Sequence, residues 1–115
     1  MKLDLIWEDR NKEKYNIAKL EKKEKKYLLT ICEENLKKAI RKGCVGIGNI
    51  NFLKNQYESN ELFPFFKNRI PSKNNPNIEK ILEEYNLKSY DEMELLKVTK
   101  AERQTDRYYV IQSDK

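Results

Sequence analysis

The sequence predicts an α+β fold: a small antiparallel sheet with helices grouped in the second half of the chain. Two observations carry this prediction. Apolar side chains alternate with polar ones through the first 30 residues, which is the period of β-strands, whereas apolar residues recur at helical spacing after residue 75. Because the chain has 115 residues, we expect a single domain over residues 1–112 and a frayed tail at 113–115.

Three strands are expected in succession near the N-terminus. The first follows the alternation of Leu3, Leu5 and Trp7. The polar segments 8–12 and 21–26 separate it from two further strands, and such short links favour an antiparallel meander. A β-branched and aromatic run near the C-terminus predicts one more strand. The expected strands cover residues 3–7, 15–20, 27–31 and 108–111.

A first helix is expected over residues 33–42. Acidic residues occupy its first turn, basic residues its end, and Gly43 follows it, which matches the helix dipole and the preference for glycine after a helix. Its buried face would consist of Leu36, Ala39 and Ile40. Beyond it, the glycines of residues 44–50 indicate a loop or a bulged extended segment.

Two more helices are expected in the second half. Asn75 and Pro76 form an N-cap and first-position pair, and Ser89 with Glu92 fits a capping box. The first of these helices would bury Ile78, Ile81, Leu82 and Tyr85. The second would bury Met93, or Leu95 and Leu96.

The segment 62–72, LFPFFKNRIPS, is the most informative part of the sequence. Its residues Phe63, Phe66 and Ile70 lie at spacings that allow one buried stripe. Arg69 then stands beside the rigid turn at Pro71, where it could either meet a partner or lock the turn itself.

Three side chains are candidate contacts to a protein partner. Phe65 falls outside the buried stripe of its segment, so it could point towards a partner. Arg69 has a planar guanidinium suited to a bidentate contact. Trp7, the only tryptophan, belongs to a residue type that contributes strongly to interfaces, although it could equally be a core or sheet-edge anchor.

The basic charge leaves a nucleic-acid interaction open. The net charge is +5 and the pI about 9.1. A cluster of Lys22, Lys23, Lys25 and Lys26 adjoins Tyr27, and basic surfaces with aromatic side chains can hold single strands. The same cluster also fits a charged hairpin tip that keeps the edge of a sheet from aggregating.

Composition excludes several kinds of chemistry. The chain has no histidine, so catalytic triads and dyads that need it, and zinc sites that contain it, are ruled out. The glycines of VGIGN lack the remaining residues of a dinucleotide or phosphate loop. Two cysteines make no disulfide framework, and no membrane span or signal peptide is recognisable. We therefore expect a cytoplasmic protein without enzymatic activity, cofactor or metal.

Four stretches occur in the order typical of the N-terminal subdomain of HipA-type serine/threonine kinase toxins. They are LDLIWEDRNKEKYNIAKL, PFFKNRIPS, YDEMELLKVT and RYYVI. The chain resembles that subdomain over most of its length. It is also similar to the variant that precedes HIRAN domains in some bacterial proteins, through Trp7, Asp9, Leu62-Phe63-Pro64, Phe66, Asn68-Arg69, Pro71, Leu95-Leu96 and Thr105-Asp106. It departs from the family pattern at Ala18, Ser72 and Lys100-Ala101, the first and last standing where glycine is usual.

The resemblance implies a function in regulation. A free-standing copy of this subdomain resembles HipS, the separately encoded antitoxin that docks on a HipA-family kinase core and restrains it. The HIRAN association implies a nucleic-acid-binding accessory module as an alternative. A third possibility is a small mobile-element inhibitor of a host defence enzyme on the same scaffold. Fold alone does not decide among them.

Overall fold

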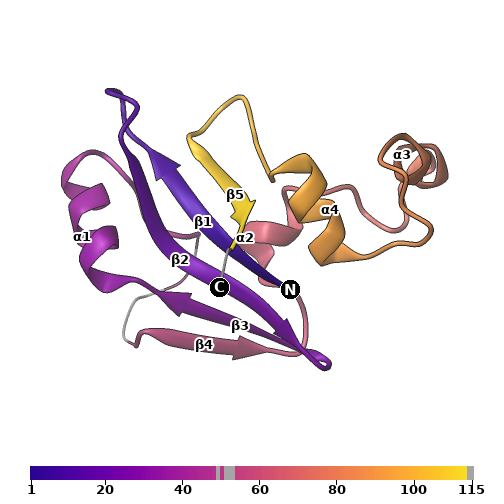
Figure 1. The fold of residues 1–115 in the computed structure, drawn as a ribbon, viewed down its shortest axis with the longest axis horizontal. Coiled ribbons are helices and arrows are strands. Elements are labelled where there is room, and N and C mark those ends of the chain that lie inside the picture. Colours follow the sequence, from indigo (N-terminus) through magenta and orange to yellow (C-terminus); the bar gives the residue numbers. More distant parts are fainter. Residues whose placement is uncertain (49, 51–53, 114–115) are drawn as a thin grey trace.

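The computed structural model of the chain describes residues 1–48, 50 and 54–113. It is an α+β fold with a five-stranded sheet and helices mostly in the second half, as the sequence predicts (Figure 1). In chain order the elements are β1 (Lys2–Glu8), β2 (Lys14–Lys23), β3 (Lys26–Ile31), α1 (Glu33–Arg41), β4 (Gln56–Ser59), α2 (Pro64–Lys67), α3 (Ile78–Glu84), α4 (Glu92–Thr99) and β5 (Tyr108–Gln112).

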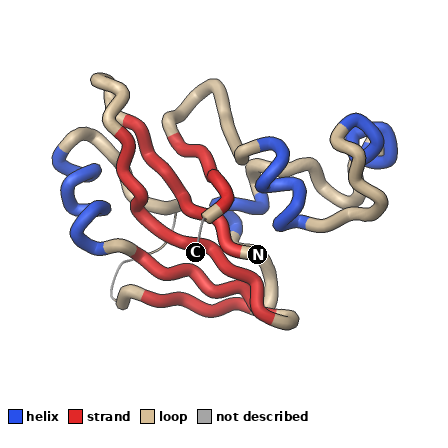
Figure 2. Tube along the Cα trace, viewed as in Figure 1, coloured by secondary structure: helices blue, strands red, loops and turns tan. Residues whose placement is uncertain are grey.

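The five strands run in the order β4-β3-β2-β1-β5, and every neighbouring pair is antiparallel. The predicted meander of the first three strands is confirmed, and β5 returns from the far end of the chain to lie beside β1 (Figure 2). Leu5 pairs with Ala18 on one side and with Val110 on the other. The last strand therefore joins the two halves of the sequence through the first.

The core is built on one row of side chains across the sheet. Leu3 pairs with Leu20, which pairs with Leu29, and all three are fully buried. Phe66 of α2 and Leu95 of α4 belong to the same buried cluster. At about 25 cal/mol per Å² of apolar surface, such burial supplies most of the stabilisation available to a small domain.

One prediction about the sheet was wrong, and one strand was not predicted. The segment 21–26 is not all connection, because β2 continues to Lys23 and only Glu24 and Lys25 form the turn. Cross-strand pairing of charged side chains makes this extension favourable: the Lys2 ammonium lies 3.5 Å from the Glu21 carboxylate. The sequence also did not predict β4, a short edge strand whose letters QYES carry almost no apolar alternation.

The first helix ends at Arg41, one residue earlier than predicted. Leu36 and Ala39 are buried as expected, but Ile40 is 46% exposed. A helix of nine residues that packs against β2 buries only a narrow stripe, and Ile40 falls outside it. Gly43 follows with a φ of 113°, a conformation that favours glycine.

The starts of the later helices differ from the predicted ones. Residue Asn75 does not cap α3; its side chain accepts a hydrogen bond from the Asn77 backbone in a turn before the helix. The predicted capping box at Ser89 is replaced by Asp91, whose carboxylate accepts from the Glu94 backbone N–H. Short polar side chains near a helix start compete for the same role, so the sequence does not single one out.

The predicted apolar face of α3 is only partly covered. This helix lies at the end of the molecule farthest from α1 (Figure 1), and none of its residues is fully buried. Tyr85 follows the helix and is 39% exposed. The face of α4 is covered instead: Met93, Leu95 and Leu96 are all buried.

The predicted frayed tail is wrong for its first residue. The Ser113 backbone N–H donates to the Lys2 carbonyl at 3.0 Å, which extends the pairing between β5 and β1. Residues 114–115 lie outside the described residues, as does Asn49 of the predicted loop at 44–50.

Candidate functional site

The segment 62–72 folds into the short helix α2 and a turn. Pro64 occupies the first helical position, where its fixed φ is favourable. Phe66 is fully buried and Ile70 nearly so, whereas Phe63 is half-buried. The predicted buried stripe is therefore confirmed at Phe66 and Ile70, and these residues of the segment belong to the core.

Arg69 is held inside the molecule. Its side chain is only 3% exposed, and its guanidinium donates to the Ala101 carbonyl at 3.0 Å and forms an ion pair with both oxygens of Asp106. A bidentate contact of this kind uses the geometry that a lysine does not have. Of the two roles that the sequence left open for Arg69, the structure shows the internal lock.

Phe65 also faces other side chains of the same chain. Its ring meets those of Phe66 and Tyr108 edge-on, with centroids 5.2 and 5.1 Å apart. The Arg69 guanidinium lies 4.5 Å from the centre of the Phe65 ring, within the range of a cation–π contact. The structure thus brings two of the three predicted partner contacts together, but it directs them at each other.

A buried polar group extends this cluster. The Tyr108 hydroxyl donates to the Gly46 carbonyl, so the Cys44 thiol, 3.5 Å away, is the donor in its own contact with that hydroxyl. Burial raises the pKa of Tyr108, and the contact with Cys44 raises it further. The sequence did not point to Tyr108, because nothing in the pattern of a strand shows whether a tyrosine hydroxyl will find a buried hydrogen-bond partner.

Trp7, the third predicted contact, is an anchor within the sheet. It is 6% exposed, and its ring lies 5.8 Å from that of Tyr15 on the neighbouring strand. Among the described residues, its ring contacts neither Phe65 nor the Arg69 guanidinium. This placement agrees with the core or sheet-edge role rather than with a large exposed contact.

The turn after Trp7 is organised by the buried carboxylate of Asp9. It accepts hydrogen bonds from the backbone N–H groups of Asn11 and Glu13, at 2.8 and 2.9 Å, and from the Tyr15 hydroxyl. Burial acts to raise the pKa of Asp9, but these hydrogen bonds outweigh it, so the pKa lies below its usual value. Burial raises the pKa of Tyr15, and the hydrogen bonds from its hydroxyl to the Glu13 and Asp9 carboxylates raise it further, to about 12.

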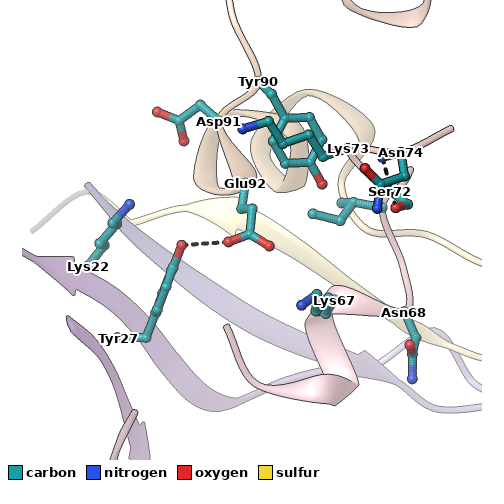
Figure 3. Close-up of a pocket in the computed structure, with 11 residues that line it drawn as sticks. Lys22, Tyr27, Lys67, Asn68, Ser72, Lys73, Asn74, Tyr90, Asp91 and Glu92 are labelled. Carbon is teal, nitrogen blue, oxygen red and sulfur yellow. Dashed lines mark hydrogen bonds between the residues drawn. The ribbon is translucent and has the colours of Figure 1, made fainter. Parts of the chain in front are cut away.

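A hollow of the described surface begins at the end of α2, where Lys67 and Asn68 line it. It has a volume of about 710 Å³ and lies between the tip of the β2–β3 hairpin, the turn after α2 and the start of α4 (Figure 3). Lys22, Lys67 and Lys73 line it, and Ile70 and Tyr90 contribute to its wall. We call this hollow the lysine groove.

The carboxylates of the lysine groove already have structural partners. Glu92 accepts a hydrogen bond of 2.9 Å from the Tyr27 hydroxyl, and Asp91 caps α4 (Figure 3). Burial raises the pKa of Tyr27, and its bond to Glu92 adds to the shift. The Tyr90 hydroxyl donates to the Pro71 carbonyl at 2.7 Å, and burial raises its pKa as well.

The predicted basic cluster at the hairpin tip is divided by the structure. The Lys22 ammonium lies 5.2 Å from the centre of the Tyr27 ring and lines the lysine groove. Lys26 forms an ion pair of 2.7 Å with Glu58, whose hydrogen bond raises the pKa of Lys26, and Lys23 lies 4.0 Å from Glu21. Lys25 is exposed in the turn.

Within residues 1–48, 50 and 54–113, no group of three or more cysteine, aspartate and glutamate side chains is placed to hold a metal ion. Every helix of that same part of the chain is too short or too polar to cross a membrane. In comparisons with known proteins, no family model, no curated protein and no solved structure matches the chain.

Proposed function

We propose that this protein is a non-catalytic regulator that acts by binding another protein. The observation that supports this most is that the carboxylates and the lysines of the lysine groove differ in their contacts. Its carboxylates are engaged in holding the fold, whereas Lys67 and Lys73 have no ion-pair acceptor among the described residues. Such a surface offers fixed contacts rather than a group poised for proton transfer.

The partner that we propose is a HipA-family kinase core in the cytoplasm, which the chain would hold inactive. This part of the proposal rests on the resemblance to HipS, carried by the segment around Phe66 and Arg69. The internal packing of both residues supports a role in shaping a docking surface rather than in forming it. The chain alone is then expected to bind nucleotides weakly or not at all and to turn over no ATP.

The nucleic-acid alternative is supported by the net charge of +5 and by the contact of Lys22 with the Tyr27 ring. Against it, the hairpin lysines do not converge on one face: Lys26 is paired with Glu58 and only Lys22 lines the groove. An inhibitor of a host defence enzyme would also bind protein, and only the identity of the partner separates it from the antitoxin proposal.

Affinity capture from the native host, carried out with and without nuclease, tests the proposal. We expect capture of a kinase that lacks its own N-terminal subdomain, unaffected by nuclease. The purified chain should then suppress autophosphorylation by that kinase. Capture that disappears with nuclease, or a kinase core whose activity is unchanged by saturating amounts of the chain, would contradict it.

A further inference from the structure

The lysine groove gathers into one hollow three lysines that have no ion pair among the described residues. On the sheet, by contrast, Lys2 lies against Glu21 and Lys26 lies against Glu58. In the groove, three exposed lysines share a hollow with two carboxylates, yet no ion pair joins them in the described part of the chain. The positive charge of the groove is therefore available to a ligand.

The wall of the groove suits an extended chain. Ile70 and Tyr90 provide apolar surface, and the Tyr90 hydroxyl is already a donor to the Pro71 carbonyl. The side-chain amides of Asn68 and Asn74 have no hydrogen-bond partner in the described residues, so they can bond to peptide groups. A volume of about 710 Å³ is within the range of sites that hold several side chains.

The two carboxylates decide between an acidic peptide and a nucleic acid. Asp91 and Glu92 lie at the start of α4 and line the same hollow as Lys22, Lys67 and Lys73 (Figure 3). A continuous phosphate backbone would pass close to both carboxylates and be repelled. A peptide can place an acidic side chain by the lysines and a neutral one by the carboxylates.

We infer that the lysine groove is the docking site for an extended acidic segment of the protein partner, with Lys67 and Lys73 as the principal contacts. This inference rests on the proposed function, because it names the chemistry of the segment that the partner presents. Electrostatic contacts of this kind set specificity and association rate, whereas Ile70 and Tyr90 bury the apolar part of the segment.

The probe is a short fluorescent peptide of alternating glutamate and serine, compared with its glutamine counterpart and with an oligothymidylate. The double variant Lys67→Glu/Lys73→Glu reverses the groove, and Lys37→Glu/Lys88→Glu makes the same change of charge at exposed positions outside it. We expect the acidic peptide to bind about tenfold more weakly to the groove variant, with the control near wild type. The milder Lys67→Gln/Lys73→Gln pair should show a smaller loss, and unchanged thermal unfolding confirms that each variant is folded.

Equal loss in the groove and control variants would overturn the inference, because net charge alone would then explain binding. Absence of binding of the acidic peptide, or binding of the oligothymidylate alone, would also overturn it. The proposed function is tested separately with the kinase core. If the kinase core binds the groove variant as tightly as wild type, the lysine groove is not the docking site, but the proposed regulatory function is retained. If the acidic peptide binds as expected but no kinase core does, the proposed partner is wrong, but the lysine groove remains a site for acidic segments.

Discussion

The buried guanidinium of Arg69 and the partly exposed carboxylate of Asp106 form an ion pair across 37 residues of sequence. This pair ties the turn after α2 to the segment that leads into β5. The Tyr108 backbone N–H also donates to Asp106 at 3.3 Å, so one carboxylate fixes both the arginine and the start of the strand. The central segment of the sequence thereby determines how the C-terminal strand enters the sheet.

Replacing Arg69 by lysine should destabilise the fold rather than affect binding alone. Lysine cannot make the bidentate contact with Asp106, reach the Ala101 carbonyl and stack on Phe65 at the same time. We expect Arg69→Lys to lower the free energy of unfolding by about 2–4 kcal/mol, measured by denaturant titration. The exposed Arg41→Lys is the control and should change it by less than about 0.5 kcal/mol. Equal stability of the two variants would show that the ion pair contributes nothing.

Truncating Phe66 should create a cavity in the centre of the core. The side chain is fully buried, so Phe66→Ala is expected to cost about 3–5 kcal/mol, a large share of the stability of a small domain. Phe63→Ala, at the half-buried position of the same segment, should cost clearly less. A loss of less than about 1 kcal/mol at Phe66 would refute its burial.

A glycine at position 100 should stabilise the protein. Lys100 follows α4 with a φ of 60°, a left-handed conformation that costs a residue with a Cβ, and its side chain is exposed. We expect Lys100→Gly to raise the free energy of unfolding by about 0.5–1 kcal/mol. The same change inside the helix, Lys97→Gly, should lower it by about 1 kcal/mol. Destabilisation by both would argue against the left-handed end of the helix.

The Asp9 carboxylate should contribute to loss of stability in acid. Its pKa is lower in the folded state, so its stabilising effect is complete above the unfolded value of about 3.9 and disappears as the pH falls through the folded value. Wild type should therefore lose more stability than Asp9→Asn as the pH falls through this range, in thermal unfolding curves. Parallel pH profiles for the two proteins would exclude the contribution.

Local patterns predicted the first strands well, because the alternation of Leu3, Leu5 and Trp7 places all three side chains on one face only if the segment is a β-strand. Edge strand β4 could not be predicted, since its stability comes from pairing with β3 rather than from its own side chains. Helix starts were misplaced by two residues where several short polar side chains compete. Lys100 and Ala101 stand where the resemblance implies a glycine, and both have a positive φ, a conformation that favours glycine.

The candidate site was predicted in part. The segment around Phe66 was identified, but Phe65 was predicted only as a candidate partner contact and Arg69 was left with two possible roles, because nothing in the sequence shows that Asp106 and Tyr108 lie beside them. Those contacts span more than thirty residues and leave no periodic signal. The lysine groove was missed for the same reason: Lys67 and Lys73 are ordinary surface residues until the fold brings them opposite the hairpin and α4.

A salt titration of binding, made against both a HipA-family kinase core and an oligonucleotide, tests the proposed function most directly. Charge reversal at Lys23 and Lys25 separates the two interactions, since it should change the rate of association with a protein more than dissociation, but abolish binding to a nucleic acid. We expect a complex with the kinase core that persists at physiological salt, together with oligonucleotide binding weaker than about micromolar. Oligonucleotide binding at micromolar concentration or tighter, falling log-linearly with salt and without any kinase complex, would contradict the account.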